Sequence, residues 1–429
     1  MGNTLNQNLS ISEKMTWFWH NHFATEMTVV KDARILYIHH AMLRANALGN
    51  FKTLTTAVTT DPAMLIYLNG DSNTGTAPDE NYGRGLQELF TVGKYNTPTY
   101  LQADVVAAAH TLTGWQVNYA TTPVTSKFTP SRHDSGNKTF SSFYNNTVIT
   151  GQSGAAGANE VTALMNMIFG ATAQQTARYI CQKLYRYFVY YDIDATIQAD
   201  IINPLAATLI ANGWNIVPVL KQLLKSDHFY DMASRGCYIR TPLDFFAGIF
   251  RSFGITLPNT FDAAKTYAIW ANVAQSAADN GLDLGEPPNV SGMPAYYQVP
   301  EYYELWINSN TYPHRLEYAD LMLGTGFTGG TGTSIKIDVL AATQAYANAS
   351  DPDMLVQYFC DLLLGISITQ THRDALKSIL LSGQTTNGYW TSAWSAYVAN
   401  PNATNKAIVK PRLTSLLTEI LHLPEHHLG

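Results

Sequence analysis

The chain has 429 residues, of which 46% are hydrophobic and only 14% are charged, and its formal net charge is −6. This length and apolar content suffice for a large core. The acidic balance and the lack of a basic block argue against nucleic acid as a partner. No apolar run is long enough for a transmembrane segment. The three cysteines are far apart and form no CxxC pair, so a zinc knuckle is not expected.

The first informative stretch is the aromatic sequence MTWFWHNHF at 15–23. A serine and a glutamate precede it, which is typical of a helix start. On a helix, Met15, Trp19 and Phe23 share one stripe at a spacing of four residues. The sequence therefore predicts an amphipathic helix whose aromatic face enters the core.

The histidines of this stretch allow two interpretations. His20 and His22 are two residues apart and do not face each other on a regular helix. They could share one ligand only if the helix ended or unwound there. His22 and Glu26 are four residues apart, so on a continuing helix they could converge on another face. One interpretation is a set of structural histidines that bond to nearby backbone. The other is a polar or metal site at the end of an aromatic helix.

Helical patterns dominate the rest of the chain, and many begin at caps such as Asp61-Pro62. Between 115 and 157 the helical period disappears, and short strands and loops are expected. The fold class is therefore all-α, a multi-helical globular fold with a small β/loop insertion. We expect an N-terminal helical region (residues 1–114), the insertion (residues 115–157), and a C-terminal helical region (residues 158–429) that forms one compact unit with the first. The expected helices span 31–48, 63–68, 81–92, 103–112, 160–190, 197–211, 216–224, 241–253, 262–277, 334–348, 354–364, 369–381 and 402–421.

Further polar groups occur in two other segments. Arg84 and Glu88 are four residues apart in a helical pattern, so they would pair on one helix face. His133 and Asp134 are adjacent in a loop rich in glycine and serine, with Lys138 close by. The chain has no HExxH, G-x-S-x-G, P-loop or strand-associated GxGxxG motif. A zincin, serine hydrolase, NTPase or Rossmann dehydrogenase is therefore disfavoured.

Taken together, these stretches resemble one bacterial family, the domain of unknown function 1800. The resemblance covers most of the chain, and the matching pieces occur in the order of the family. They are FWHNHF at 18–23, ALGNF at 47–51, DPAMLIYL at 61–68, ENYGR at 80–84, ELFTVG at 88–93, LTGW at 112–115, HDSGNK at 133–138, residues 173–188 and PPNVSG at 287–292.

The resemblance implies a largely helical, exported bacterial protein, often encoded beside a sulfatase-like partner. It carries no established activity. It does imply that polar residues from the three segments form one site. These residues are His20, His22, Asn81, Arg84, Glu88, His133 and Asp134.

Three departures from the family pattern bear on this site. Gly85 stands where relatives usually have a glutamate, so if that carboxylate is a ligand or general base in relatives, this chain lacks it. His110 stands near the position of a common arginine and is treated as structural or solvated. The chain also begins almost at the aromatic helix, so a leader and a preceding helical segment are expected to be absent from it.

The leading functional hypothesis is an exported protein with a His/Asp/Glu/Arg polar site, which could be a metal-dependent hydrolase. His20, His22 and His133 would bind a divalent ion, zinc, manganese or iron. Arg84, Glu88 and Asp134 would be catalytic, with either carboxylate taking a proton from metal-bound water. The alternative is a non-catalytic secreted or cell-surface protein that binds glycan or a partner protein. The expected location is periplasmic or extracellular in both cases.

Overall fold

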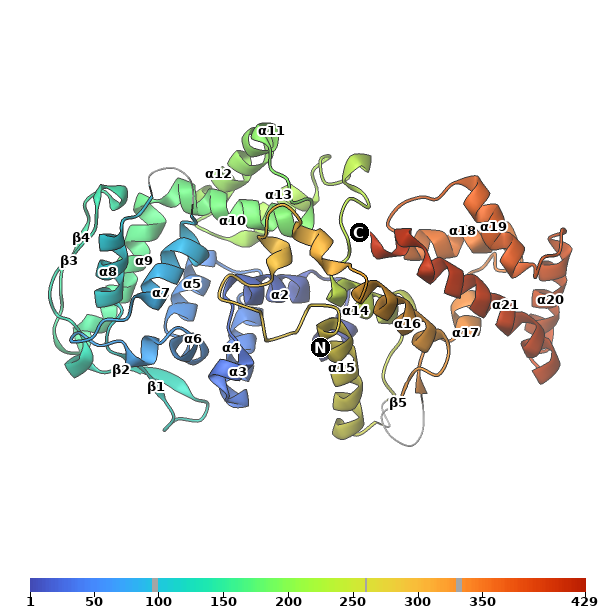
Figure 1. Ribbon diagram of the computed structural model, residues 1–429, viewed down its shortest axis with the longest axis horizontal. Coiled ribbons are helices and arrows are strands. Elements are labelled where there is room, and N and C mark those ends of the chain that lie inside the picture. Colours follow the sequence, from blue (N-terminus) through green and yellow to red (C-terminus); the bar gives the residue numbers. More distant parts are fainter. Residues whose placement is uncertain (95–98, 259–260, 329–333) are drawn as a thin grey trace. The chain divides into compact units, whose positions relative to one another are not determined.

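The computed structural model describes residues 1–94, 99–258, 261–328 and 334–429. Within them, helices dominate, and strands occur only in three two-stranded antiparallel pairs (Figure 1). This confirms the predicted all-α class with a small β/loop insertion. Among the described helices, none combines the length and the apolar character that crossing a bilayer requires.

The chain forms two compact units. Unit 1 consists of residues 1–8, 231–284 and 303–429, and unit 2 of residues 9–230 and 285–302. The C-terminal helical region predicted for residues 158–429 is therefore shared between both units.

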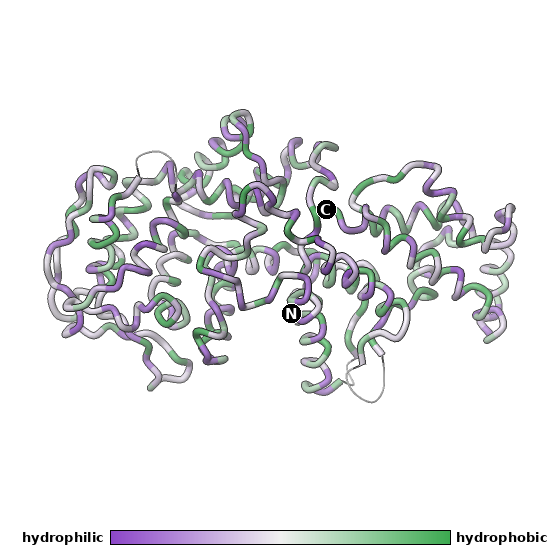
Figure 2. The backbone as a smooth tube through the Cα atoms, in the orientation of Figure 1, coloured by the Kyte–Doolittle hydropathy of each residue, from purple (hydrophilic) through white to green (hydrophobic). Residues whose placement is uncertain are grey.

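Unit 2 is a multi-helical body that carries the β/loop insertion. Figure 2 shows hydrophilic and hydrophobic residues alternating along its helices, as expected of amphipathic helices. Its helices are α2 (Ser12–His22), α3 (Met27–Val30), α4 (Ala33–Ala45), α5 (Phe51–Thr59), α6 (Pro62–Tyr67), α7 (Glu80–Gly85), α8 (Gln102–Thr111), α9 (Glu160–Ala171), α10 (Ala173–Phe188), α11 (Ala195–Ile197), α12 (Asn203–Ala211) and α13 (Ile216–Leu224), with π-helical segments at Leu86–Thr91 and Gln198–Ile202.

The core of unit 2 forms around α2. The predicted stripe of Met15, Trp19 and Phe23 is fully buried, which confirms the amphipathic assignment. The Trp19 ring stacks on Phe51 with a centroid distance of 5.5 Å, and its indole nitrogen donates to the Ala47 carbonyl at 2.9 Å. One side chain therefore joins α2 to α5 and to the turn that precedes it.

The insertion contains the strand pairs β1 (Trp115–Asn118) with β2 (Thr125–Phe128) and β3 (Lys138–Thr139) with β4 (Val148–Ile149). All four strands lie within the predicted span 115–157. Strand β3 packs on α8 and β4 packs on α9. The insertion is thus held against the two helices that flank it in the chain.

Unit 1 contains the remaining helices and one strand pair. The last helix continues through Pro411, although a proline inside a helix removes one backbone hydrogen bond. Its elements are α1 (Gly2–Asn6), α14 (Pro242–Ser252), α15 (Ala263–Ala278), α16 (Thr311–Leu323), β5 (Phe327–Thr328), β6 (Ser334–Ile335), α17 (Val339–Gln344), α18 (Pro352–Leu363), α19 (Gln370–Leu380), α20 (Gly388–Ala399) and α21 (Ala403–His422).

The central position of Trp19 gives a stability prediction. Trp19→Ala removes a buried aromatic ring and leaves a cavity, so we expect it to lower the free energy of unfolding by about 3–5 kcal/mol. Urea unfolding followed by circular dichroism measures the change. Tyr37→Ala, at a side chain that is 76% exposed, is the control and should shift stability by less than ~0.5 kcal/mol. Equal effects of the two substitutions would contradict the role of Trp19.

Candidate functional site

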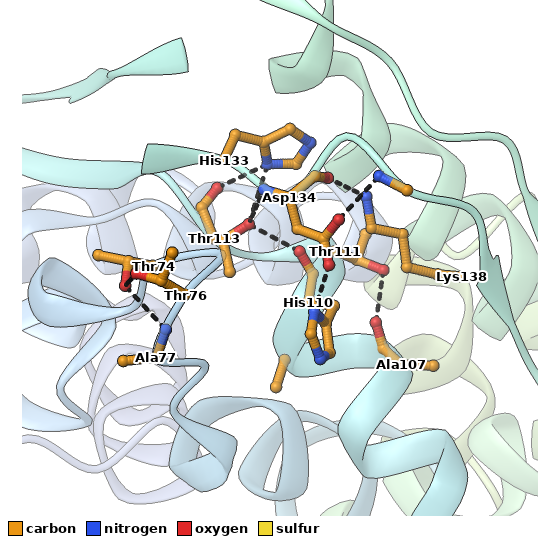
Figure 3. Close-up of polar contacts among 12 residues, drawn as sticks. Thr74, Thr76, Ala77, Ala107, His110, Thr111, Thr113, His133, Asp134 and Lys138 are labelled. Carbon is orange, nitrogen blue, oxygen red and sulfur yellow. Dashed lines mark hydrogen bonds and ion pairs between the residues drawn. The ribbon is translucent and has the colours of Figure 1, made fainter. Parts of the chain in front are cut away.

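The most connected polar cluster of unit 2 surrounds the turn between α8 and β1 (Figure 3). His110 lies in the last turn of α8, and Asp134 follows the short 3-10 helix Pro130–Arg132. The Nδ1 atom of His110 and Oδ2 of Asp134 form a hydrogen bond. Both side chains remain partly exposed, at 31% and 26%. The pair is therefore the solvent-accessible end of the cluster.

Thr113 ties the two segments together. Its hydroxyl donates to the His110 carbonyl at 2.8 Å and accepts from the backbone N–H of Asp134 at 2.9 Å. A second loop also approaches closely, since a Cβ on Gly75 would lie 3.0 Å from the Asp134 nitrogen. The backbone that carries Asp134 is thus held from two sides.

The inner end of the cluster is a buried ion pair. Glu160 Oε2 accepts from Lys138 Nζ at 2.7 Å, and Glu160 Oε1 lies 3.1 Å from His133 Nε2. Side-chain exposure is 2% for Lys138 and for His133 and zero for Glu160. Because the backbone N–H of Gln152 also donates to Oε1 at 2.7 Å, the buried carboxylate is well compensated.

Asp134 is placed to remain ionised. Partial burial raises the pKa of its carboxyl, but hydrogen bonds from the Gly136 N–H and His110, with the charge of Lys138, outweigh burial and lower the pKa overall. A carboxylate that accepts from a histidine Nδ1 fixes the orientation and tautomer of the ring. In the described part of the chain, Nε2 of His110 has no hydrogen-bond partner. This nitrogen is therefore free to exchange a proton.

His133 and Asp134 are the only sequence-predicted site residues that described contacts bring together. The ring nitrogens of His133 face oxygens of Thr113 and Glu160, so neither is free for a metal ion. Among the described residues, no group of three or more His, Cys, Asp or Glu side chains is arranged to hold a metal. The structure thus gives the predicted metal-ligand role of His133 no support.

His22 lies at another place in unit 2, where its ring contacts a backbone carbonyl and a lysine amine. It is buried where α2 ends, its Nε2 lies 3.0 Å from the Phe90 carbonyl, and Lys183 Nζ lies 3.0 Å from its Nδ1. Burial, and then the charge of Arg186, lowers the pKa of Lys183 to about 7. Glu26 bonds to the hydroxyl of Tyr67 instead, because the chain leaves the helix after His22.

His20 also lacks the surroundings of a metal ligand. Its ring stacks on His40 with a centroid distance of 4.7 Å, and its buried Nε2 has no hydrogen-bond partner among the described residues. Burial lowers its pKa well below the ordinary value, and the nearby His40 and His39 lower it further. His20 is therefore a neutral ring within the core.

Arg84 and Glu88 do not pair, and this element of the prediction was wrong. Arg84 bonds to Glu80 at 3.0 Å and to Gln102 at 2.8 Å, whereas Glu88 accepts from the hydroxyl of Tyr100 at 3.0 Å. The cause is the π-helical segment that begins after α7, since its wider turn changes the angular spacing of residues four apart.

Sequence reasoning missed three participants, His110, Glu160 and Lys183. His110 had a weak signal, because it stands where the family commonly has an arginine. An acidic residue in the first turn of a helix usually lies at the surface, so nothing local marked Glu160 as buried. Lys183 is 161 positions from its partner His22, and no spacing rule covers such a pair.

The buried ion pair gives a prediction with a matched control. Lys138→Met leaves the buried Glu160 carboxylate without its main counter-charge, so we expect a loss of about 3–5 kcal/mol in the free energy of unfolding. Lys377→Met breaks the exposed pair with Asp353 and should cost at most ~1 kcal/mol. Calorimetric unfolding compares them. Similar losses in both variants would show that the Glu160 cluster is not a stabilising pair.

The buried histidines give a pH prediction. The pKa of His20 and His22 lies well below the ordinary value, and burial, followed by the charges of His39 and Arg44, lowers that of His40 to about 3. As the pH falls below the unfolded pKa of about 6.5, only the unfolded chain gains these protons. Stability should therefore be complete above pH ~6.5 and decline by up to ~1.4 kcal/mol per pH unit for each histidine.

Urea unfolding at several pH values between 7 and 5 measures this slope. His40→Phe keeps an aromatic ring beside His20 and should make the slope shallower, whereas His372→Phe on the exposed surface of α19 should leave it unchanged. A wild-type stability that is flat over this range would contradict the neutral, buried state of these rings.

Comparisons with known proteins identify the family of the chain and nothing more specific. A family model described as "Protein of unknown function (DUF1800)" matches residues 1–427. Neither a curated protein nor a solved structure matches the chain. The family match confirms the resemblance drawn from the ordered motifs. The chain therefore belongs to the DUF1800 family, whose function is unknown.

Proposed function

We propose that the protein is a hydrolase whose general base is the pair of His110 and Asp134. One observation carries this proposal. The imidazole is oriented by an ionised carboxylate at Nδ1, while its opposite nitrogen has no partner among the described residues and the side chain is partly exposed. A positioned histidine of this kind is the commonest general base in enzymes.

The chemistry assigned to the pair is activation of water. Nε2 of His110 takes a proton from a water molecule as the water oxygen attacks an electrophilic centre of the substrate. Asp134 holds the ring and stabilises the imidazolium that forms. The imidazolium then returns the proton to the leaving group. General acid–base catalysis of this type contributes about 10²–10⁴-fold to a rate.

The remaining predicted residues enter this proposal in different ways. Asp134 keeps a catalytic position, although through His110 rather than as the base itself. The catalytic roles of Arg84 and Glu88 stay predictions, because the described hydrogen bonds of these two side chains do not connect them to His110 or Asp134. The divalent ion also stays a prediction, and no step above passes through it. Elemental analysis of the purified protein tests it, and less than roughly one ion per ten chains would reject it, because a resident ion occupies most chains.

Substitution of the pair tests the proposed base. A panel of chromogenic esters, phosphate and sulfate monoesters and glycosides first identifies a substrate of the wild type. His110→Gln should then lower kcat by about 10²-fold or more, and Asp134→Asn should lower it with the helical spectrum retained. His314→Gln is the matched control, since His314 also bonds a carboxylate, that of Glu317, at 3.2 Å on an exposed surface.

The experiment distinguishes a wrong general base from a wrong reaction class. Activity that survives His110→Gln, or that falls equally in His314→Gln, rejects the assigned base. A wild type that hydrolyses no member of the panel, in a preparation that is fully folded, rejects hydrolysis of these substrate classes and favours the second candidate function.

That second candidate is non-catalytic binding of a glycan. A cavity of about 570 Å³ lies between α4 and the loop before β2, and Arg34, Tyr37 and Pro123 line it. This volume is in the range of small-ligand sites, and the exposed Tyr37 ring offers a stacking surface. By contrast, the rings of Tyr296 and Tyr302 pack against those of Tyr187 and Tyr191. Loss of glycan retention in Tyr37→Ala would support this function.

We also propose a periplasmic or extracellular location and a sulfatase-like partner protein. The low content of charged residues and the family membership support the location, and the resemblance to the family supports the partner. Fractionation of the native host tests the location, and a wholly cytoplasmic protein would reject it. Co-purification from the same host tests the partner, and recovery without any sulfatase-like protein would reject it.

A further inference from the structure

Unit 1 buries a cationic cluster that the proposed function does not use. Arg315, on α16, is fully buried. Its Nη2 donates to the carbonyls of Arg240 at 2.9 Å and Trp306 at 3.4 Å. Its Nε and Nη1 atoms have no hydrogen-bond partner in the described part of the chain. A guanidinium is always charged in proteins, so it cannot reduce the cost of burial by losing its proton.

A second guanidinium lies close to the first. Arg240 donates to the carbonyls of Leu428 at 2.8 Å and Leu363 at 3.3 Å. Among the described residues, neither Arg240 nor Arg315 has a carboxylate within ion-pair distance. Burial, and then repulsion from Arg240, lowers the pKa of Arg315 to about 10. The fully buried Arg315 and the partly buried Arg240 thus both use carbonyl oxygens as their acceptors.

The turn at Pro424–His427 adds further ring nitrogens without partners. His426 and His427 are 2% and 1% exposed. Within the described ranges, His426 Nε2 and both ring nitrogens of His427 lack hydrogen-bond partners. Burial is the main cause that lowers the pKa of each ring to about 3. Each imidazole is therefore neutral and carries one N–H group. The N–H of His426 lies on Nδ1 and donates to the Leu363 carbonyl at 2.9 Å, so only His427 offers a free donor.

These groups converge on one phenyl ring. The guanidinium carbon of Arg315 lies 5.1 Å from the Phe245 centroid. The rings of His426 and His427 lie 5.2 Å and 5.0 Å from the same centroid. The unpartnered donors therefore belong to one small region, and buried polar groups that lack partners indicate an unobserved water or ion.

The charge balance favours an anion over water. Asp244 raises the pKa of both guanidiniums, so its charge reaches them. Glu425, whose Oε2 also lacks a partner among the described residues, lies in the same turn, and no described ion pair joins it to either guanidinium. Arg315 is therefore a fully buried cation without a carboxylate at ion-pair distance in the described part of the chain, and a buried charge is costly unless it is compensated.

We propose that unit 1 binds one small monovalent anion of the size of chloride between Arg315, Arg240 and the His426–His427 turn. The anion accepts hydrogen bonds from a free Nη1–H of Arg315 and from the N–H of His427. It thereby fixes the terminal turn against α14 and α16. The site is structural and is independent of the His110–Asp134 pair.

Thermal unfolding of the full chain tests the site with chloride as the probe. Sodium chloride replaces sodium gluconate at constant ionic strength, so screening does not change. The wild-type Tm should rise saturably, by roughly 3 °C or more. Arg315→Met should abolish the rise, whereas Arg251→Met, at an exposed guanidinium of the same unit that also binds only carbonyls, should retain it.

A second variant covers the case in which Arg315→Met does not fold. His427→Phe keeps a ring stacked on Phe245 and removes the imidazole donors, so it should need about tenfold more chloride for the half-maximal rise, since a lost hydrogen bond to a charged group weakens binding by this order. A wild-type Tm that is independent of chloride shows that water fills the region and overturns the proposal. An equal chloride response in the wild type, Arg315→Met and His427→Phe also overturns it.

Discussion

The buried carboxylate of Glu160 is the interaction on which unit 2 depends most directly. It accepts from Lys138, from the Gln152 N–H and from the His133 ring. These donors belong to the insertion, whereas Glu160 opens α9 of the helical frame. Burial of a charge is tolerated only with such full compensation. Without this carboxylate, the loop that presents Asp134 to His110 would lose its inner attachment.

Both units bury imidazole rings as part of their polar interior. In unit 2, His20 stacks on His40, and His22 bridges a carbonyl and an amine. In unit 1, His426 and His427 surround a phenylalanine. A neutral imidazole combines a flat apolar surface with one donor and one acceptor, so it suits a chain in which few residues are charged. Burial of these neutral rings makes the folded state less stable in acid, because unfolding allows each imidazole to take up a proton.

Local sequence information predicted the helical frame well, because periodicity and capping act within a few residues. The stripe through Trp19 and the cap at Asp61, which accepts from the N–H groups of Ala63 and Met64, are examples. The candidate site was only half predictable. His133 and Asp134 were visible as neighbours in a loop, but their partners His110 and Glu160 come from flanking helices. The π-helical segment at Leu86–Thr91 changes the angle between Arg84 and Glu88, and no residue pattern in the sequence predicted this segment.

The path of the chain through the two units constrains how the protein is made. Residues 1–8 belong with residues 231–284 and 303–429, and Arg251 donates to the carbonyls of Thr4 and Gln7. During synthesis from the N-terminus, the first segment therefore waits for more than half of the chain before its partner exists. Unit 2 is likewise incomplete until residues 285–302 have left the ribosome. A nascent chain of this protein carries open apolar surfaces for most of its translation, and such surfaces are what chaperones recognise.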